Sequence, residues 1–377
     1  MTSTAPQPNT SPIQTRDDLL AYLVVAMQIE HATIPPYLTA LYSIRPGSNS
    51  EAVEVIRSVA VEEMLHLTLV VNVYNAVGGS MRRTLTAPGF MPTYPTALPT
   101  GETEFEVGLR GFSPETIDTF MKIERMLDEP EDAPLTVPRS ERCLGVLPGA
   151  GADRISFYSI GQFYAAVIQG LFHLSQSLGE TTLFNGDPSR QITPEYYYNG
   201  AGSVHAVSDL DSAIRALRII QEQGEGSPRG HRIYAGTATD ERPLAHYFRF
   251  QQLRLGRYYQ TVRPAEGDGP DSDSPDEPTG ASFASSELDW SAVYPIKADL
   301  RLADLPEGSE VRQRALAFQQ EYSRFLLELE RAFDGAPAQL IPAVGGMFRL
   351  RTLAEELVRM PIPGQPALHA APLYTLG

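Results

Sequence analysis

Two apolar stretches near the N-terminus each carry ionisable side chains. The first is QIEHATIPPYL, residues 28–38, inside the apolar run LLAYLVVAMQIEHATIPPYLTALYSI of residues 19–44. The second is VEEMLHLTLVV, residues 61–71. Apolar stretches of this kind predict two helices, and the glutamate and histidine in the middle of each helix need a physical explanation.

The helical phase places three of these ionisable side chains on the apolar faces. Glu63 and His66 are three residues apart and point the same way as Val59 and Val70. Glu30 continues a 3–4 spacing formed by Leu19, Leu23, Ala26, Thr33 and Tyr37. Burying ionisable groups without partners is costly, and a metal cation satisfies carboxylate and imidazole together. Glu30, Glu63 and His66 are therefore predicted metal ligands.

The neighbouring ionisable residues have a different phase. His31 lies about 100° round the helix from Glu30, so we expect it to pack or to support a ligand. Glu62 points away from the direction of Glu63, and we expect it to form a salt bridge rather than to bind metal. Tyr158, Tyr164 and Tyr247 are expected mainly in the core, with lining of a substrate pocket as the alternative.

Composition excludes several classes of function. The chain has 377 residues, a net charge of −16 and one cysteine, Cys143. The negative charge disfavours nucleic acid and anionic membranes as partners, and a single cysteine allows no internal disulfide framework and no thiolate metal cage. The polar N-terminus does not resemble a signal peptide, and no apolar run is long enough to span a membrane. We therefore expect a cytoplasmic protein.

The chain divides into four segments. Residues 1–16 are expected to be a disordered arm, and residues 264–288 a mobile acidic loop, because residues 264–282 carry six acids and no base. Residues 17–263 form the expected bundle, and residues 289–377 a C-terminal helical extension packed on it. The long helices are expected at residues 17–43, 50–77, 156–178, 208–223, 243–262, 309–333 and 338–360.

Three local features refine this division. Pro35 and Pro36 are expected to kink the first helix, because proline removes a backbone donor. FEVGLRGF, residues 105–112, is a candidate strand. Ser113 and Pro114 then start a short helix, as N-cap and first helical residue.

The order of the elements predicts an all-α bundle with one long crossover, between the second and third long helices. That connection is typical of the ferritin-like bundles, in which two helices each give a Glu and two each give a Glu-x-x-His pair, all pointing inward. Glu30 corresponds to a lone Glu, and Glu63 with His66 to one Glu-x-x-His pair. A lone Glu-x-x-His on a helix surface is common by chance, and its place on the apolar face next to Glu30 favours the metal interpretation.

The chain resembles the ferritin-like domain that is also found in the bacterial iminophenyl-pyruvate dimer synthases of violacein- and indolocarbazole-type pathways. The resemblance runs from about residue 17 to about residue 374. Those synthases are longer and carry additional sequence associated with a haem, so the resemblance implies a stand-alone ferritin-like portion without haem. The resemblance is seen in QIEHATIPPYLTALYSI, VEEMLHLTLVVNVYNAVGG, SIGQFYAAVIQGL, IIQEQGEGS, LAHYFRFQQL and the closing helices.

The resemblance also implies further ligands. His246 and Glu225 match positions expected to bind metal, while Gln162 and Pro243 stand where two more carboxylates would be needed. One metal is therefore favoured, with two as the alternative. Oxygen and nitrogen ligands suit Fe(II) or Mn(II). If two metals bind, Glu63 is the expected bridging carboxylate.

These observations predict a non-haem, metal-dependent oxidoreductase of bacterial specialised metabolism. Its expected partners are dioxygen and a small, amino-acid-derived molecule, and a homo-oligomer is compatible with the sequence. The alternative is a non-catalytic metal-binding or scaffold protein of the same fold. The two missing carboxylates favour the alternative, whereas burying three ionisable groups without a purpose disfavours it.

Overall fold

The protein is built almost entirely of helices. The computed structural model describes residues 13–97, 105–124, 137–138, 155–156, 159–198, 202–224, 244–259, 278, 280–284 and 287–377. Strands are confined, within these residues, to two short antiparallel pairs. These are β1 (Val137–Pro138) with β2 (Ile155–Ser156), and β3 (Pro361–Ile362) with β4 (Gln365–His369).

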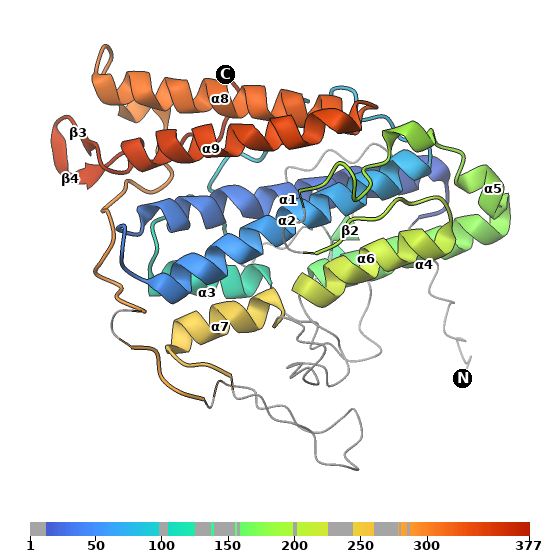
Figure 1. Ribbon diagram of the computed structural model, residues 1–377, viewed down its shortest axis with the longest axis horizontal. Helices are drawn as coiled ribbons and strands as arrows, with labels where there is room; N and C mark the ends of the chain where they lie inside the picture. Colours follow the sequence, from blue (N-terminus) through green and yellow to red (C-terminus); the bar gives the residue numbers. More distant parts are fainter. Residues whose placement is uncertain are drawn as a thin grey trace, which may run out of the picture.

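Two long helices, α1 (Arg16–Ser43) and α2 (Ser50–Ala76), form an antiparallel hairpin through the centre of the molecule (Figure 1). A capping box starts α1, in which Thr15 and Asp18 satisfy each other's backbone N–H groups. Beyond the end of α2, Gly78 adopts a positive φ of 86°, which a glycine tolerates best. Local sequence therefore determines both ends of the hairpin, with a capping box at its start and a glycine at its end.

The helix α1 continues through Pro35 and Pro36, which were expected to kink it. Pro36 has no N–H to donate to the carbonyl of Ala32, four residues earlier. The hydroxyl of Tyr94 donates to that carbonyl instead, at 2.7 Å. One backbone acceptor that the proline would leave unpaired is therefore satisfied from outside the helix.

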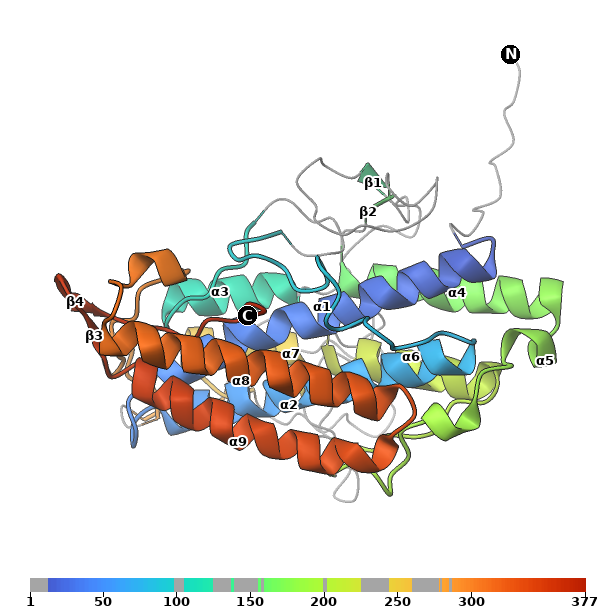
Figure 2. The same cartoon turned by 90° about the horizontal axis from the view of Figure 1, so that it is seen from above.

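Four shorter helices cover one face of the hairpin. They are α3 (Pro114–Ile123), α4 (Ile160–Leu178), α6 (Leu210–Gly224) and α7 (His246–Leu255). α3 and α4 lie one after the other along α1, and α7 and α6 lie in the same way along α2 (Figures 1 and 2). The serines at positions 113 and 159 cap α3 and α4 with side-chain oxygens. A four-helix bundle has two more helices beside such a hairpin. Here a pair of shorter helices takes the place of each of them, and the ends of the paired helices meet beside the hairpin.

Two further long helices, α8 (Glu310–Phe333) and α9 (Leu340–Leu357), cover the opposite face of the hairpin (Figures 1 and 2). The buried carboxylate of Glu330 in α8 accepts hydrogen bonds from the backbone N–H groups of Arg83 and Thr86. The C-terminal helices are therefore bound to the chain that follows α2. Short helices join the long ones: α5 (Glu180–Leu183) and the 3₁₀ turns at Pro188–Arg190, Leu302–Asp304 and Pro337–Gln339.

Three expectations differ from the structure. The strand expected at residues 105–112 is wrong, since only Val107 pairs, with Thr96. The helix expected to reach residue 262 ends at Leu255, because Gly256 turns into the left-handed region with φ 63°. Within the expected N-terminal arm, Ile13 is buried.

No helix in the described part of the chain is long and apolar enough to cross a membrane.

Candidate metal centre

The ends of the four shorter helices converge on the middle of the hairpin. His246 is the first residue of α7, and Glu124 directly follows the last residue of α3. Gln223 lies in the last turn of α6, and Tyr164 in the first turns of α4. Side chains from the ends of four separate helices therefore lie beside the same part of the hairpin.

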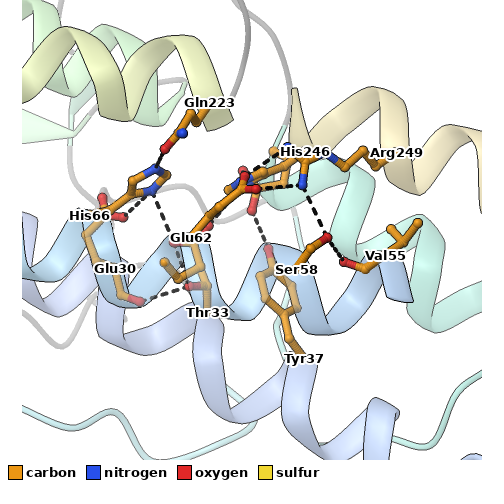
Figure 3. Close-up of polar contacts among 12 residues, drawn as sticks. Glu30, Thr33, Tyr37, Val55, Ser58, Glu62, His66, Gln223, His246 and Arg249 are labelled. Carbon is orange, nitrogen blue, oxygen red and sulfur yellow. Dashed lines mark hydrogen bonds and ion pairs between the residues drawn. The ribbon is translucent and has the colours of Figure 1, made fainter. Parts of the chain in front are cut away.

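The first ligand group consists of Glu30, Glu63 and His66, and each of these side chains is at most 4% exposed. Nδ1 of His66 lies 3.2 Å from Oε2 of Glu30 and 3.9 Å from Oε2 of Glu63. Nε2 of His66 contacts Oε1 of Gln223 at 2.8 Å, which fixes the plane of the ring (Figure 3). The three predicted ligands therefore meet, with one imidazole nitrogen facing two carboxylates.

The second ligand group consists of Glu63, Glu124 and His246, and these side chains are equally buried. Nδ1 of His246 lies 3.0 Å from Oε1 of Glu63 and 3.5 Å from Oε2 of Glu124. The rings of His66 and His246 are stacked with their centroids 5.5 Å apart. Glu63 thus belongs to both groups, and its two oxygens face different histidines.

The other bonds of the carboxylates hold them in place. Tyr164 donates its hydroxyl to Oε1 of Glu30, and Tyr37 donates to Oε1 of Glu124. Thr33 donates to Oε2 of Glu63 at 3.2 Å. Each carboxylate therefore has a fixed orientation, which is the usual support that surrounding residues provide to metal ligands.

The donor set fits metal ions. Nδ1 of His246 is buried and has no hydrogen-bond partner of acceptable geometry among the described residues, although it faces two carboxylates. A cation placed between the nitrogen and the oxygens satisfies all three atoms, whereas a proton satisfies only one pair. Carboxylate oxygens with imidazole nitrogens, and no thiolate, suit Fe(II) or Mn(II).

The pKa shifts of the side chains in the two ligand groups indicate that both sites favour a positive charge. Burial alone lowers the pKa of His66, but the carboxylates of Glu30 and Glu63 outweigh it and raise the pKa to about 10. The pKa of His246 is also raised well above its usual range, against its burial, by Glu124, Glu62 and Glu63. Burial raises the pKa of Glu30 to about 7. Burial opposes charge on Glu63 as well, but both histidines lower its pKa.

Glu62 has a separate structural role. Its carboxylate accepts two hydrogen bonds from the guanidinium of Arg249, both at 2.9 Å, and contacts Nε2 of His246 at 2.8 Å (Figure 3). The salt bridge expected from its helical phase is thus present. Because Glu62 holds Nε2, the opposite nitrogen of His246 is directed at Glu63 and Glu124.

The remaining predicted positions have different outcomes. Tyr158, Glu225 and Pro243 lie outside the described residues. Gln162 is 3% exposed and belongs to neither ligand group in the described part of the chain. His31 is buried away from both groups, with Nε2 2.7 Å from the hydroxyl of Tyr322 in α8. Tyr164, expected mainly in the core with lining of the pocket as the alternative, contacts Glu30.

Sequence reasoning missed Glu124. A signal for it exists, because Ile117, Phe120 and Glu124 follow the same 3–4 spacing that identified Glu30, and the first two are buried. The short helix that it follows was assigned to the crossover rather than to the bundle, so Glu124 was not considered as a ligand.

Comparison with known proteins identifies the family. The ferritin-like family model matches residues 23–255, more than half of the chain. The chain belongs to the ferritin-like family, and its predicted all-α bundle is confirmed.

Two individual proteins are similar over most of this chain. Dichlorochromopyrrolate synthase of Lentzea aerocolonigenes is 24% identical over 417 aligned positions, which cover 97% of this chain and 36% of that enzyme. This chain thus spans about a third of that relative's length, and the match supports the relationship that the resemblance predicted. A crystal structure of a ferritin-like protein from Caulobacter vibrioides matches with a TM-score of 0.58 and 22% identity, covering 97% of this chain and 100% of that one. The second similarity concerns the fold alone.

Proposed function

We propose that the chain is an oxidoreductase that holds two iron or manganese ions and oxidises a small organic molecule with dioxygen. The observation that carries the proposal is the position of Glu63, whose two oxygens belong to two buried ligand groups. Ligand groups that share one carboxylate suit a pair of neighbouring metal ions.

Two metals are preferred to the single metal that the sequence favoured. The prediction of a single metal rested on Gln162 and Pro243, which stand where two carboxylates were expected. Glu124 supplies a carboxylate from another helix, and it faces His246. Each half of the centre then has one histidine, one carboxylate of its own and a share of Glu63.

Each protein group has a definite task in this proposal. Iron or manganese, when bound, supplies the binding and reduction of dioxygen. The carboxylates of Glu30, Glu63 and Glu124 balance the positive charge, and Tyr37 and Tyr164 hold two of them in place. Burial of all these groups keeps bulk water away from the reacting centre.

The substrate class follows from the similarities rather than from the geometry. The relative in Lentzea aerocolonigenes is named a dichlorochromopyrrolate synthase. We place the present chain in bacterial specialised metabolism, acting in the cytoplasm on a small amino-acid-derived molecule. The net charge of −16 supports a small-molecule partner over nucleic acid.

Oxygen consumption tests this proposal. The chain, loaded anaerobically with Fe(II), is mixed with amino-acid-derived amines and 2-oxo acids in air-saturated buffer, and dioxygen is followed with an electrode. We expect at least one compound to increase uptake in the parent and none to do so in Glu63→Ala. A chain that binds metal but gives no uptake above the variant with any compound would support the scaffold alternative.

A further inference from the structure

A cavity lies on the opposite side of the hairpin from the metal centre. It has a volume of about 70 Å³ and is lined by residues of α1, α2, α8 and α9, together with Tyr197, Tyr198 and Tyr374. His31 and Met64 face it, although each directly follows a predicted metal ligand in the sequence. Because consecutive helical residues point about 100° apart, the α1–α2 layer separates the cavity from the ligand groups.

Among the described residues, four polar atoms of the cavity wall are buried without a hydrogen-bond partner: Nδ1 of His31 and the hydroxyls of Tyr197, Tyr198 and Tyr374. His31 is 4% exposed, and its Nδ1 has no hydrogen-bond partner among the described residues. Its other nitrogen, Nε2, lies 2.7 Å from the hydroxyl of Tyr322. A buried polar atom without a partner costs free energy, and its presence in a cavity wall indicates a ligand that supplies the missing bond.

We propose that this cavity is a second binding site, for a small uncharged aromatic molecule that carries a hydroxyl group. The site goes beyond the proposed oxidation and does not depend on it. Its ligand would donate to, or accept from, Nδ1 of His31 and would pack its ring against the surrounding aromatic side chains.

The chemistry of the wall determines this class. The hydroxyl of Tyr322 can donate to Nε2 of His31 or accept from it, so Nδ1 is either a donor or an acceptor. A ligand hydroxyl satisfies both arrangements, whereas a ketone satisfies only one. No arginine or lysine is among the described residues that line the cavity, so a carboxylate ligand finds no counter-charge there.

The size of the cavity restricts the ligand to a single ring. The volume of about 70 Å³ is roughly half of the ~150 Å³ apolar cavity that holds benzene in a studied case. Met64 and Met347 form part of the wall, and methionine side chains adapt readily to a changed volume. A phenol-sized molecule therefore fits after a small movement of these two side chains.

Phenol, benzene and benzoate are suitable probes, titrated into the full chain by ligand-observed NMR. We expect phenol to bind roughly fivefold to tenfold more tightly than benzene, the advantage of one hydrogen bond, and benzoate not to bind. His31→Phe should remove the advantage of phenol and leave benzene unaffected. The matched control is His173→Phe, because His173 is exposed on α4 and lines no part of this cavity.

Two results would overturn the proposal. One is equal affinity for phenol and benzene in the parent chain, and the other is an advantage of phenol that persists in His31→Phe. A measurement on the unaltered chain does not depend on whether the variant folds. Imidazole ¹⁵N spectra serve this purpose, because they distinguish Nδ1 from Nε2. Saturating phenol should shift Nδ1 of one buried histidine, and an unchanged spectrum would contradict the site. None of these readouts involves metal or dioxygen.

Discussion

Glu124 is the residue that decides whether the second ligand group can hold a metal. Its carboxylate lies 3.5 Å from Nδ1 of His246 and is held by Tyr37. Glu124→Ala leaves the second group with only Glu63 and His246, and two protein ligands bind a divalent ion poorly. We expect metal content to fall from two ions to one per chain, measured by elemental analysis after anaerobic loading with Fe(II). Glu115→Ala, exposed on the same helix, should keep both ions; equal loss in the two variants would show that the effect is not local.

Glu62 should act on the metal only through His246. Glu62→Ala leaves the guanidinium of Arg249 buried without a carboxylate, and we expect the free energy of unfolding to fall by roughly 3–5 kcal/mol. It also frees Nε2 of His246, so binding at the second group should weaken by about 10–100-fold. Calorimetric titration with Mn(II) should show one weakened step and one unchanged step. Two equally weakened steps would contradict this separation, and Glu54→Ala on the exposed face of α2 serves as the control.

At the residue scale, the sequence identified the ionisable groups whose helical phase is unambiguous. Glu30, Glu63 and His66 lie on long apolar stripes, and the structure brings them together with His246, which only the resemblance indicated. Glu124 directly follows a helix of only ten residues, in which an apolar stripe has few members and the helical phase is easily overlooked. Contacts such as that of Tyr164 with Glu30 depend on how helices pack, which one chain's periodicity does not specify.

At the scale of elements, α1 illustrates how a tertiary contact supports a helix at a locally unfavourable position. Two consecutive prolines lie inside this helix of 28 residues. The hydroxyl of Tyr94, from the segment after α2, satisfies the carbonyl of Ala32. Similarly, the third and fourth bundle positions are each divided between two helices, so a second Glu-x-x-His in one continuous helix is replaced by Glu124 and His246 from two helix ends.

The hydrogen bond from Tyr94 to α1 contributes measurably to the free energy of unfolding. Tyr94→Phe removes the hydroxyl and leaves the carbonyl of Ala32 buried without a donor, because Pro36 has none. We expect a loss of about 1–2 kcal/mol in the free energy of unfolding, measured by urea denaturation. A stability unchanged within about 0.3 kcal/mol would mean that another group satisfies that carbonyl.

At the scale of the whole molecule, the acidic segment predicted at residues 264–288 is paired, near its end, with the chain that precedes it. The N–H of Gly280 donates to the carbonyl of Tyr258 at 2.8 Å, and the N–H of Tyr258 donates to the carbonyl of Ala281 at 3.0 Å. Tyr258, before the segment, is therefore paired with Gly280 and Ala281, inside its predicted bounds, independently of the length of chain between them.

Deleting residues 266–278 should leave the fold and the metal centre intact. The two flanks remain paired, and loop closure entropy changes only with the logarithm of length. We expect the thermal midpoint to change by less than about 4 °C, which corresponds to ~1 kcal/mol or a little more for a domain this large. A larger drop, or a loss of metal, would show that the segment is docked on the bundle. Thermal melts and metal analysis of the deletion variant beside the parent decide between these outcomes.

The central claim is that one buried carboxylate, Glu63, is shared by two metal ions. The most direct measurement is the number of metal atoms per chain after anaerobic loading with Fe(II) and removal of loosely bound metal, by elemental analysis against a quantified protein concentration. The account predicts about two ions per chain, and about none in Glu63→Ala because both ligand groups lose their common member. One ion per chain in the parent, or full retention of both ions in Glu63→Ala, would contradict it.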